Sequence, residues 1–222
     1  METILVACET IKDEIVHALE EQGLTYEVVW LEGGLHSNPM RLKTRVQEVL
    51  NEVEGRCQRL LLALGFCGGG LTGLFTGNYE TVIPLTDDCL TLLLGSLKAR
   101  QEASHPVTYF FTDGWLRHEQ NLLTSYKMSY ATFDEEMAAY INKTLLEGYS
   151  RLGILDTRCY DIDKVVEMVK PMAIDLGLSI EVIQVDPSWL TDFLSGPYDD
   201  SARFLRLPPN STLDLSDWLE KL

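Results

Sequence analysis

The sequence has no apolar run long enough to cross a bilayer. Its longest apolar runs, 60–70 and 90–95, fall well short of the roughly 20 residues that a membrane-spanning helix needs. The first residues lack a basic region and a small-residue cleavage site, so we expect no signal peptide. Low-complexity tracts and internal repeats are also absent. These absences predict a globular, cytoplasmic protein.

Basic residues are scarce. The chain has 18 Lys and Arg against 34 Asp and Glu, which gives a formal net charge of −16. A negative field of this size repels phosphate backbones and anionic lipid surfaces, and no cluster of Lys and Arg compensates for it locally. We therefore exclude nucleic acid and membranes as partners, and expect a small molecule or another protein.

The five cysteines form no CxxC pair and their number is odd. Neither a zinc-finger spacing nor a disulfide framework fits this pattern. In the cytoplasm the thiols should be reduced, so each cysteine is core filler, a nucleophile or a metal ligand. Cys57 and Cys159 have no neighbours that suggest chemistry, and we interpret both as structural.

Short apolar segments alternate with amphipathic ones along the chain. The predicted strands are 3–7, 24–31, 59–64, 81–85, 107–112, 151–155 and 178–185, with an edge strand at 204–207. The predicted helices are 11–22, 41–53, 90–99, 133–147, 161–176 and a terminal helix at 214–222. This alternation predicts a Rossmann-like α/β fold, with a mostly parallel sheet covered by helices on both faces. We expect one domain over 1–222, in which the irregular connection 114–131 is a candidate lobe junction.

Four metal-ligand side chains follow four successive predicted strands. Cys8 follows the first strand, His36 the second, Cys67 the third and Cys89 the fourth. Because parallel strands end at the same edge of a sheet, their side chains should converge there. The pattern predicts a metal site made of Cys8, Cys67, Cys89 and His36. The plain alternative for each cysteine is core filler, and for His36 a solvated loop.

The surroundings of two cysteines favour a site. Cys67 precedes three glycines, and Gly68 and Gly69 would let the backbone approach a cofactor closely. Asp88 precedes Cys89, where it is either a ligand or the cap of the next helix. A thiol at a helix N-terminus should have a lowered pKa. The glycines also suggest a phosphate loop, but they match neither common nucleotide-binding motif.

Several motifs together resemble a known family. They are the run Gly65–Leu74, the segments Ile83-Pro84, Asp88-Cys89 and Leu94-Gly95-Ser96, the triplet Ala7-Cys8-Glu9, the loop Leu35-His36-x-x-Pro39 and the pair Gly114-Trp115. The chain resembles an uncharacterised family of anaerobic bacteria and methanogenic archaea. Its members are often encoded beside corrinoid-dependent methyltransferases of the trimethylamine and glycine betaine type. The resemblance implies a role in one-carbon metabolism and supports the cysteines as site residues, but it supplies no mechanism.

Three functions stay open. The first is a metal-binding enzyme or accessory factor of corrinoid-dependent methyl transfer, with zinc or a [4Fe-4S] cluster as cofactor. A closed zinc site would be structural only. The second is a metal-free enzyme in which two cysteines act as an acid/base pair. The third is a non-catalytic partner of a corrinoid protein or carrier of a small molecule.

Overall fold

The computed structural model describes residues 2–214 and 216. The chain divides into two compact units, of which unit 1 contains Met1–Leu97 and Asp186–Leu222 and unit 2 contains Lys98–Val185. Unit 1 is therefore discontinuous in sequence. Residues 114–131, the candidate lobe junction, lie inside unit 2. The terminal helix predicted at 214–222 falls outside the described residues, apart from Asp214 and Ser216.

Unit 1 is built on a five-stranded sheet in the order β2-β1-β3-β4-β8. Its strands are β1 (Thr3–Cys8), β2 (Glu27–Leu31), β3 (Arg59–Ala63), β4 (Glu80–Pro84) and β8 (Phe204–Leu207). The first four strands run parallel, and β8 pairs antiparallel with β4. The five strands predicted for this part of the chain are confirmed, including the edge strand.

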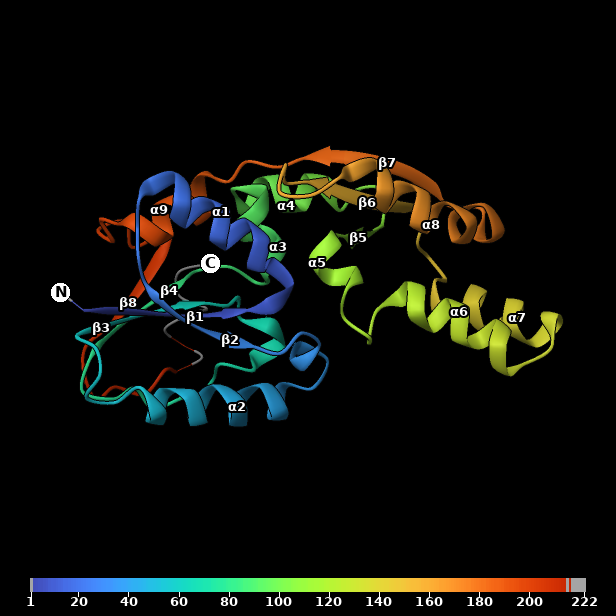
Figure 1. Ribbon diagram of the computed structural model, residues 1–222. Helices are drawn as coiled ribbons and strands as arrows, with labels where there is room; N and C mark the ends of the chain where they lie inside the picture. The colour runs from blue at the N-terminus through green and yellow to red at the C-terminus, as the bar shows by residue number, and fades with distance from the viewer. Residues whose placement is uncertain (1, 215, 217–222) are drawn as a thin grey trace. The chain divides into compact units, whose positions relative to one another are not determined.

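Helices cover both faces of the sheet in unit 1 (Figure 1). They are η1 (Glu9–Ile11), α1 (Lys12–Gln22), η2 (Leu35–Ser37), α2 (Pro39–Glu52), η3 (Cys67–Gly69), α3 (Cys89–Leu94) and α9 (Ser188–Ser195). Helix α2 lies on one face, whereas α1, α3 and α9 lie on the other. The Asn38 side chain accepts a hydrogen bond from the Arg41 amide, and Pro39 is the first residue of α2. This is the helix entry that the sequence predicts.

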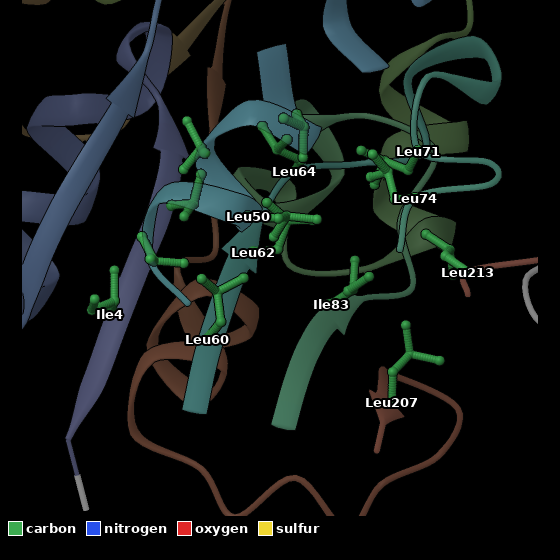
Figure 2. Close-up of a cluster of buried hydrophobic side chains, with 14 of the residues drawn as sticks. Ile4, Leu50, Leu60, Leu62, Leu64, Leu71, Leu74, Ile83, Leu207 and Leu213 are labelled. Atoms are coloured by element: carbon green, nitrogen blue, oxygen red, sulfur yellow. The ribbon is translucent and has the colours of Figure 1, made fainter. Parts of the chain in front are cut away.

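The main core of unit 1 lies between the sheet and α2 (Figure 2). Ile4, Leu60, Leu62 and Ile83 come from the sheet, and the predicted apolar stripe of α2 faces them. That stripe consists of Leu42, Val46, Val49, Leu50 and, just after the helix, Val53. All of these side chains are almost fully buried. Because a shift of one residue would turn them out of the core, their burial fixes the register of each strand.

Unit 2 has a smaller parallel sheet in the order β5-β6-β7. Its elements are β5 (Thr108–Phe111), β6 (Arg151–Asp156), β7 (Ser179–Gln184), α4 (Leu97–Ala103, all but its first residue), α5 (Asp113–Leu116), α6 (Leu122–Thr132), α7 (Glu135–Leu145) and α8 (Ile162–Leu176). The core of this unit joins Phe111, Leu152 and Ile154 of the sheet to Val165 and Val169 of α8.

Three details of the predicted elements are wrong. The single helix at 90–99 is two helices, because the chain turns at Gly95, whose φ is 80°. The connection 114–131 is not irregular, since it holds α5 and α6, capped by the side chains of Thr112 and Asn121. The sequence analysis also missed α9, which buries Trp189 and Phe193 in unit 1.

The predicted fold class is confirmed. The chain has an α/β fold with mostly parallel, Rossmann-like sheets and helices packed around them, although there are two sheets rather than one. Over the described residues, no helix is both long enough and apolar enough to span a membrane.

Candidate functional site

The strand order of unit 1 changes direction between β1 and β3. The chain passes from β1 to β2 on one side and then crosses back over β1 to β3 on the other. The connecting helices α1 and α2 leave on opposite faces of the sheet (Figure 1). Parallel α/β proteins bind ligands at such a switch point, beside the carboxyl ends of the two strands. Cys8 is the last residue of β1, and Cys67 follows β3, so two of the predicted ligands flank this point.

Cys67 lies in a backbone conformation that non-glycine residues seldom adopt. Its φ is 48°, and the next two residues, Gly68 and Gly69, have φ values of 67° and 92°. A left-handed cysteine is strained by about 1–2 kcal/mol relative to its usual conformations. Such strain is commonly found where a side chain is held for a function.

The loops after β3 and β4 run side by side. The Phe66 amide donates to the Thr86 carbonyl at 2.8 Å, and the Cys67 amide donates to the Asp87 carbonyl at 2.9 Å. Gly65 permits this approach, because a β-carbon there would lie 2.5 Å from the Asp88 Cα. The pairing carries Cys67 towards the start of α3.

Cys89 is the first residue of α3, and Asp88 caps that helix. One Asp88 carboxylate oxygen, Oδ1, accepts from the Thr91 amide and from the Thr91 hydroxyl, both at 2.9 Å. The structure thus shows the capping role that the sequence left open for Asp88. A further role of the Asp88 carboxylate in cofactor binding stays a prediction.

Cys8 has a local partner that the sequence analysis missed. Its Sγ lies 3.1 Å from the Thr10 hydroxyl oxygen, and Thr10 is buried. The signal was a hydroxyl residue two positions after the cysteine, within the turn that leaves the strand. Cys8 and Cys67 both pack against the main core of unit 1, together with Leu35 and Phe66.

We call Cys8, Cys67 and Cys89 the thiol cluster, because each is close enough to another to perturb its ionisation. The pKa of the Cys67 thiol is raised to about 12, mainly by burial and also by the charges of Asp88 and Cys8. Burial also raises the pKa of Cys89 well above its usual value, and Cys8, Cys67 and Asp88 add to this. The lowered pKa predicted for Cys89 is therefore wrong, since burial and its negative neighbours outweigh its place at a short helix.

The pKa of Cys8 is raised as well. Burial is the largest cause, and the hydrogen bonds from Thr10 only partly offset it, while Glu9 raises the pKa further. All three thiols are thus neutral near pH 7 in this structure. A cation placed among them would reverse the effect of their mutual repulsion and favour the thiolates.

His36 lies in η2, after β2, with an exposed side chain. The loop of His36 nevertheless approaches the cluster, because Pro39 lies next to Gly68. Within residues 2–214 and 216, no group of three or more His, Cys, Asp or Glu side chains is arranged to hold a metal ion.

Glycine is favoured at positions 68 and 69 by the positive φ of the backbone and not by close neighbours. A β-carbon at Gly68 would meet Pro39 at 3.9 Å, and one at Gly69 would meet the Phe66 ring at 3.9 Å, which are ordinary contacts. The amides of Gly69 and Gly70 donate to the carbonyls of Phe66 and Cys67. Because these two amides serve the turn itself, the geometry does not favour a phosphate loop here.

A family model for proteins of unknown function, DUF1638, matches residues 30–194. This span covers well over half of the chain. The chain belongs to this family. The DUF1638 match includes His36, Cys67, Cys89 and all of unit 2, and it begins after Cys8. Searches of curated proteins and of solved structures found no match.

Proposed function

We propose that this DUF1638 protein binds a thiophilic metal centre, zinc or an iron–sulfur cluster, through the thiol cluster. The observations that carry the proposal are that two free cysteines, Cys8 and Cys67, flank the switch point of unit 1, and that Cys89 is near enough to both for their charges to raise its pKa. Three thiols are a donor set that suits zinc or an iron–sulfur cluster. Hard cations such as Mg²⁺ prefer oxygen, and the cluster offers little of it.

Binding requires the side chains to adjust, since the described residues hold no ready-made metal arrangement. Rotation of a cysteine about χ1 moves its sulfur between staggered positions without moving the backbone. The backbone of the cluster is already fixed by the paired loops after β3 and β4. His36, the fourth ligand that the strand-end pattern predicts, or Asp88 would complete the coordination.

The raised pKa values weigh against the metal-free acid/base alternative. That chemistry needs one thiolate and one thiol. The pKa of Cys67, however, is raised to about 12, and the pKa of Cys89 is raised well above its usual value. A neutral thiol is a poor base and a poor nucleophile near pH 7. A bound metal ion would supply the positive charge that turns these thiols into thiolates.

The resemblance to proteins encoded beside corrinoid-dependent methyltransferases suggests what the centre serves. A zinc ion held by the three thiols alone, without His36 or Asp88, would keep a fourth position open, and a substrate thiol bound there would be activated for methyl transfer. An iron–sulfur cluster would deliver electrons to a corrinoid protein instead. Whether the centre is coloured and redox active separates these two roles.

The test is metal analysis of the full chain purified without oxygen. Iron, zinc and acid-labile sulfide are measured in the parent protein and in Cys8→Ser, Cys67→Ser and Cys89→Ser. Cys57→Ser is the matched control, because Cys57 is buried in the same unit but precedes β3 at the opposite end of the strand from Cys67. We expect the metal to be lost in the three cluster variants and kept in the control.

Two outcomes of this experiment contradict the proposal. One is a parent protein without metal after purification and after incubation with zinc or with iron and sulfide. The other is a metal content that none of the three cluster substitutions lowers. Zinc without iron would favour thiol activation, and iron with sulfide in a brown protein would favour electron transfer.

A further inference from the structure

Helix α7 buries Ala138 and Asn142, half-buries Ile141 and exposes its other large apolar side chains. Ala138 and Asn142 are the buried residues of this helix. Met137 is 47% exposed and Tyr140 is 68% exposed. A surface helix of a globular domain usually shows the reverse pattern. The outer face of α7 is therefore built like the inner face of a helix that has a partner.

The inner contact of α7 is made by the small residue Ala138 and the polar residue Asn142. The Asn142 amide donates to the Ser129 hydroxyl of α6 at 2.6 Å, and the Ser129 hydroxyl donates to the Tyr126 carbonyl. With Ala138 beside this bond, α6 and α7 pack closely as a helical hairpin (Figure 1). The contact is satisfied by polar groups, and Met137 and Tyr140 lie outside it as exposed side chains.

The outer face carries charge of both signs at opposite ends. Five exposed residues share this face because they follow one another at helical spacing. They are Glu136, Met137, Tyr140, Lys143 and Thr144. Acidic residues occupy the first turn of α7, and Lys143 lies in its last turn. An identical helix that runs antiparallel would thus meet a face of opposite charge at each end.

We propose that the outer face of α7 pairs with the same face of a second copy of this chain, across a two-fold axis. If the axis passes between Ala139 and Tyr140, Glu136 of each copy lies opposite Lys143 of the other. The apolar side chains of Met137 and Tyr140 then lie at the centre, and the helix dipoles run antiparallel. The observations that favour a second copy over another partner are this self-complementary charge pattern and the apolar centre between the charges.

The paired hairpins form a four-helix arrangement of α6 and α7 from each copy. Helix α7 has 11 residues and is about 16 Å long, so its contact is short. Phe133, 49% exposed, lies at the corner between α6 and α7 and adds an exposed apolar side chain near the start of α7. Because interfaces below about 1,200 Å² are weak, we expect a reversible dimer whose population depends on concentration.

The first experiment is sedimentation equilibrium of the full chain over a range of concentrations. We expect a monomer–dimer equilibrium in the parent protein. Tyr140→Glu should raise the dimer dissociation constant at least about tenfold, because it removes a central aromatic contact and adds a charge. Ile174→Glu is the matched control, since Ile174 is an exposed apolar residue of α8 in the same unit, and it should leave the equilibrium unchanged.

The second experiment tests the antiparallel pairing. Glu136→Lys and Lys143→Glu each place like charges opposite one another and should weaken the dimer when each variant is alone. A mixture of the two variants restores both opposite-charge pairs and should form heterodimers. The double variant Glu136→Lys with Lys143→Glu should dimerise like the parent. The recovery of dimers in the mixture and in the double variant cannot come from a change in folding, because Glu136 and Lys143 are both exposed on the outside of α7.

The proposal is overturned if the parent chain is a monomer at every concentration up to the solubility limit. It is also overturned if a dimer forms but neither single charge reversal weakens it, or if the mixture of the two variants gives no heterodimer. In those cases the outer face of α7 is occupied by something other than a second copy.

Discussion

The two units differ in how completely they cover their apolar surface. In unit 1 helices lie on both faces of the sheet, and β8 covers the edge of β4. The edge strands differ as well, since four of the six residues of β7 in unit 2 are exposed, against one of the five of β2 in unit 1. Of the twelve large apolar side chains that are exposed in the described part of the chain, nine lie in unit 2. Unit 1 therefore has the features of a self-contained body that carries a site, and unit 2 those of a body that makes contacts.

The largest expected effect separates the cores of the two units. Phe111→Ala removes a fully buried ring from unit 2 and should lower its free energy of unfolding by about 3–5 kcal/mol. Leu62→Ala should lower that of unit 1 by about 2–5 kcal/mol. Hydrogen exchange followed by mass spectrometry should show faster exchange in β6 for the first variant and in β3 for the second. Equal loss of protection in both units would mean that they share one core.

A second prediction concerns the loop that positions the thiol cluster in unit 1. Gly65→Ala places a β-carbon 2.5 Å from the Asp88 backbone, so the loop after β4 must move. We expect a loss of about 1–3 kcal/mol in stability, by thermal or chemical denaturation, together with a lower metal content. Gly148→Ala in unit 2 is the control, since a β-carbon there meets nothing within 4 Å. It should affect stability through its φ of 88° alone and leave metal binding intact. An unchanged metal content in Gly65→Ala would show that the loop contact does not position the thiols.

A third prediction compares one ion pair from each unit, and the substitution in unit 2 has the smallest expected effect. The Glu80 carboxylate of β4 accepts from Arg59 at 2.7 Å and from Arg206 at 2.6 Å, and its side chain is 21% exposed. Glu80→Gln should cost about 1.5–3 kcal/mol. In unit 2, Glu181 pairs with Arg151, but its side chain is 54% exposed, so Glu181→Gln should cost less, about 0–1 kcal/mol. Comparable losses in chemical denaturation would contradict this order.

The Glu80 pair also predicts a dependence on pH. Burial raises the pKa of the Glu80 carboxyl, but hydrogen bonds from Arg206 and Arg59 outweigh it and hold the pKa below its ordinary value of 4.5. Because the folded pKa is the lower one, the stabilisation is complete above pH 4.5 and is lost as the pH falls below it. Denaturation curves of the parent and of Glu80→Gln should therefore converge in acid. Curves that stay equally far apart there would argue against this linkage.

Much of the fold could be predicted because its elements follow strong local patterns. The strands are continuous apolar runs, and α2 has a clear apolar stripe and an Asn-Pro entry. Helix α6 was missed because its apolar residues do not form one stripe, and only the Asn121 cap marks its start. Helix α9 was missed although Trp189, Leu190, Phe193 and Leu194 do form one. It was not recognised because it is only eight residues long and directly follows Pro187.

The thiol cluster could be predicted only in part. The strand-end positions of Cys8, Cys67 and Cys89 follow from the alternation of elements alone. Their raised pKa values do not, because burial and mutual repulsion depend on how loops distant in sequence pack. The geometry of Gly65 against Asp88, which brings two of these loops together, likewise has no local signature.

The discontinuity of unit 1 has a consequence for synthesis on the ribosome. The segments α9 and β8, which cover a face and an edge of the unit 1 sheet, follow residue 185 and emerge only after all of unit 2. Unit 2 begins later than unit 1 but is the first to be complete outside the exit tunnel. Since domains fold as units while the chain grows, the nascent chain carries an unfinished unit 1, with the edge of β4 open, until β8 has left the exit tunnel.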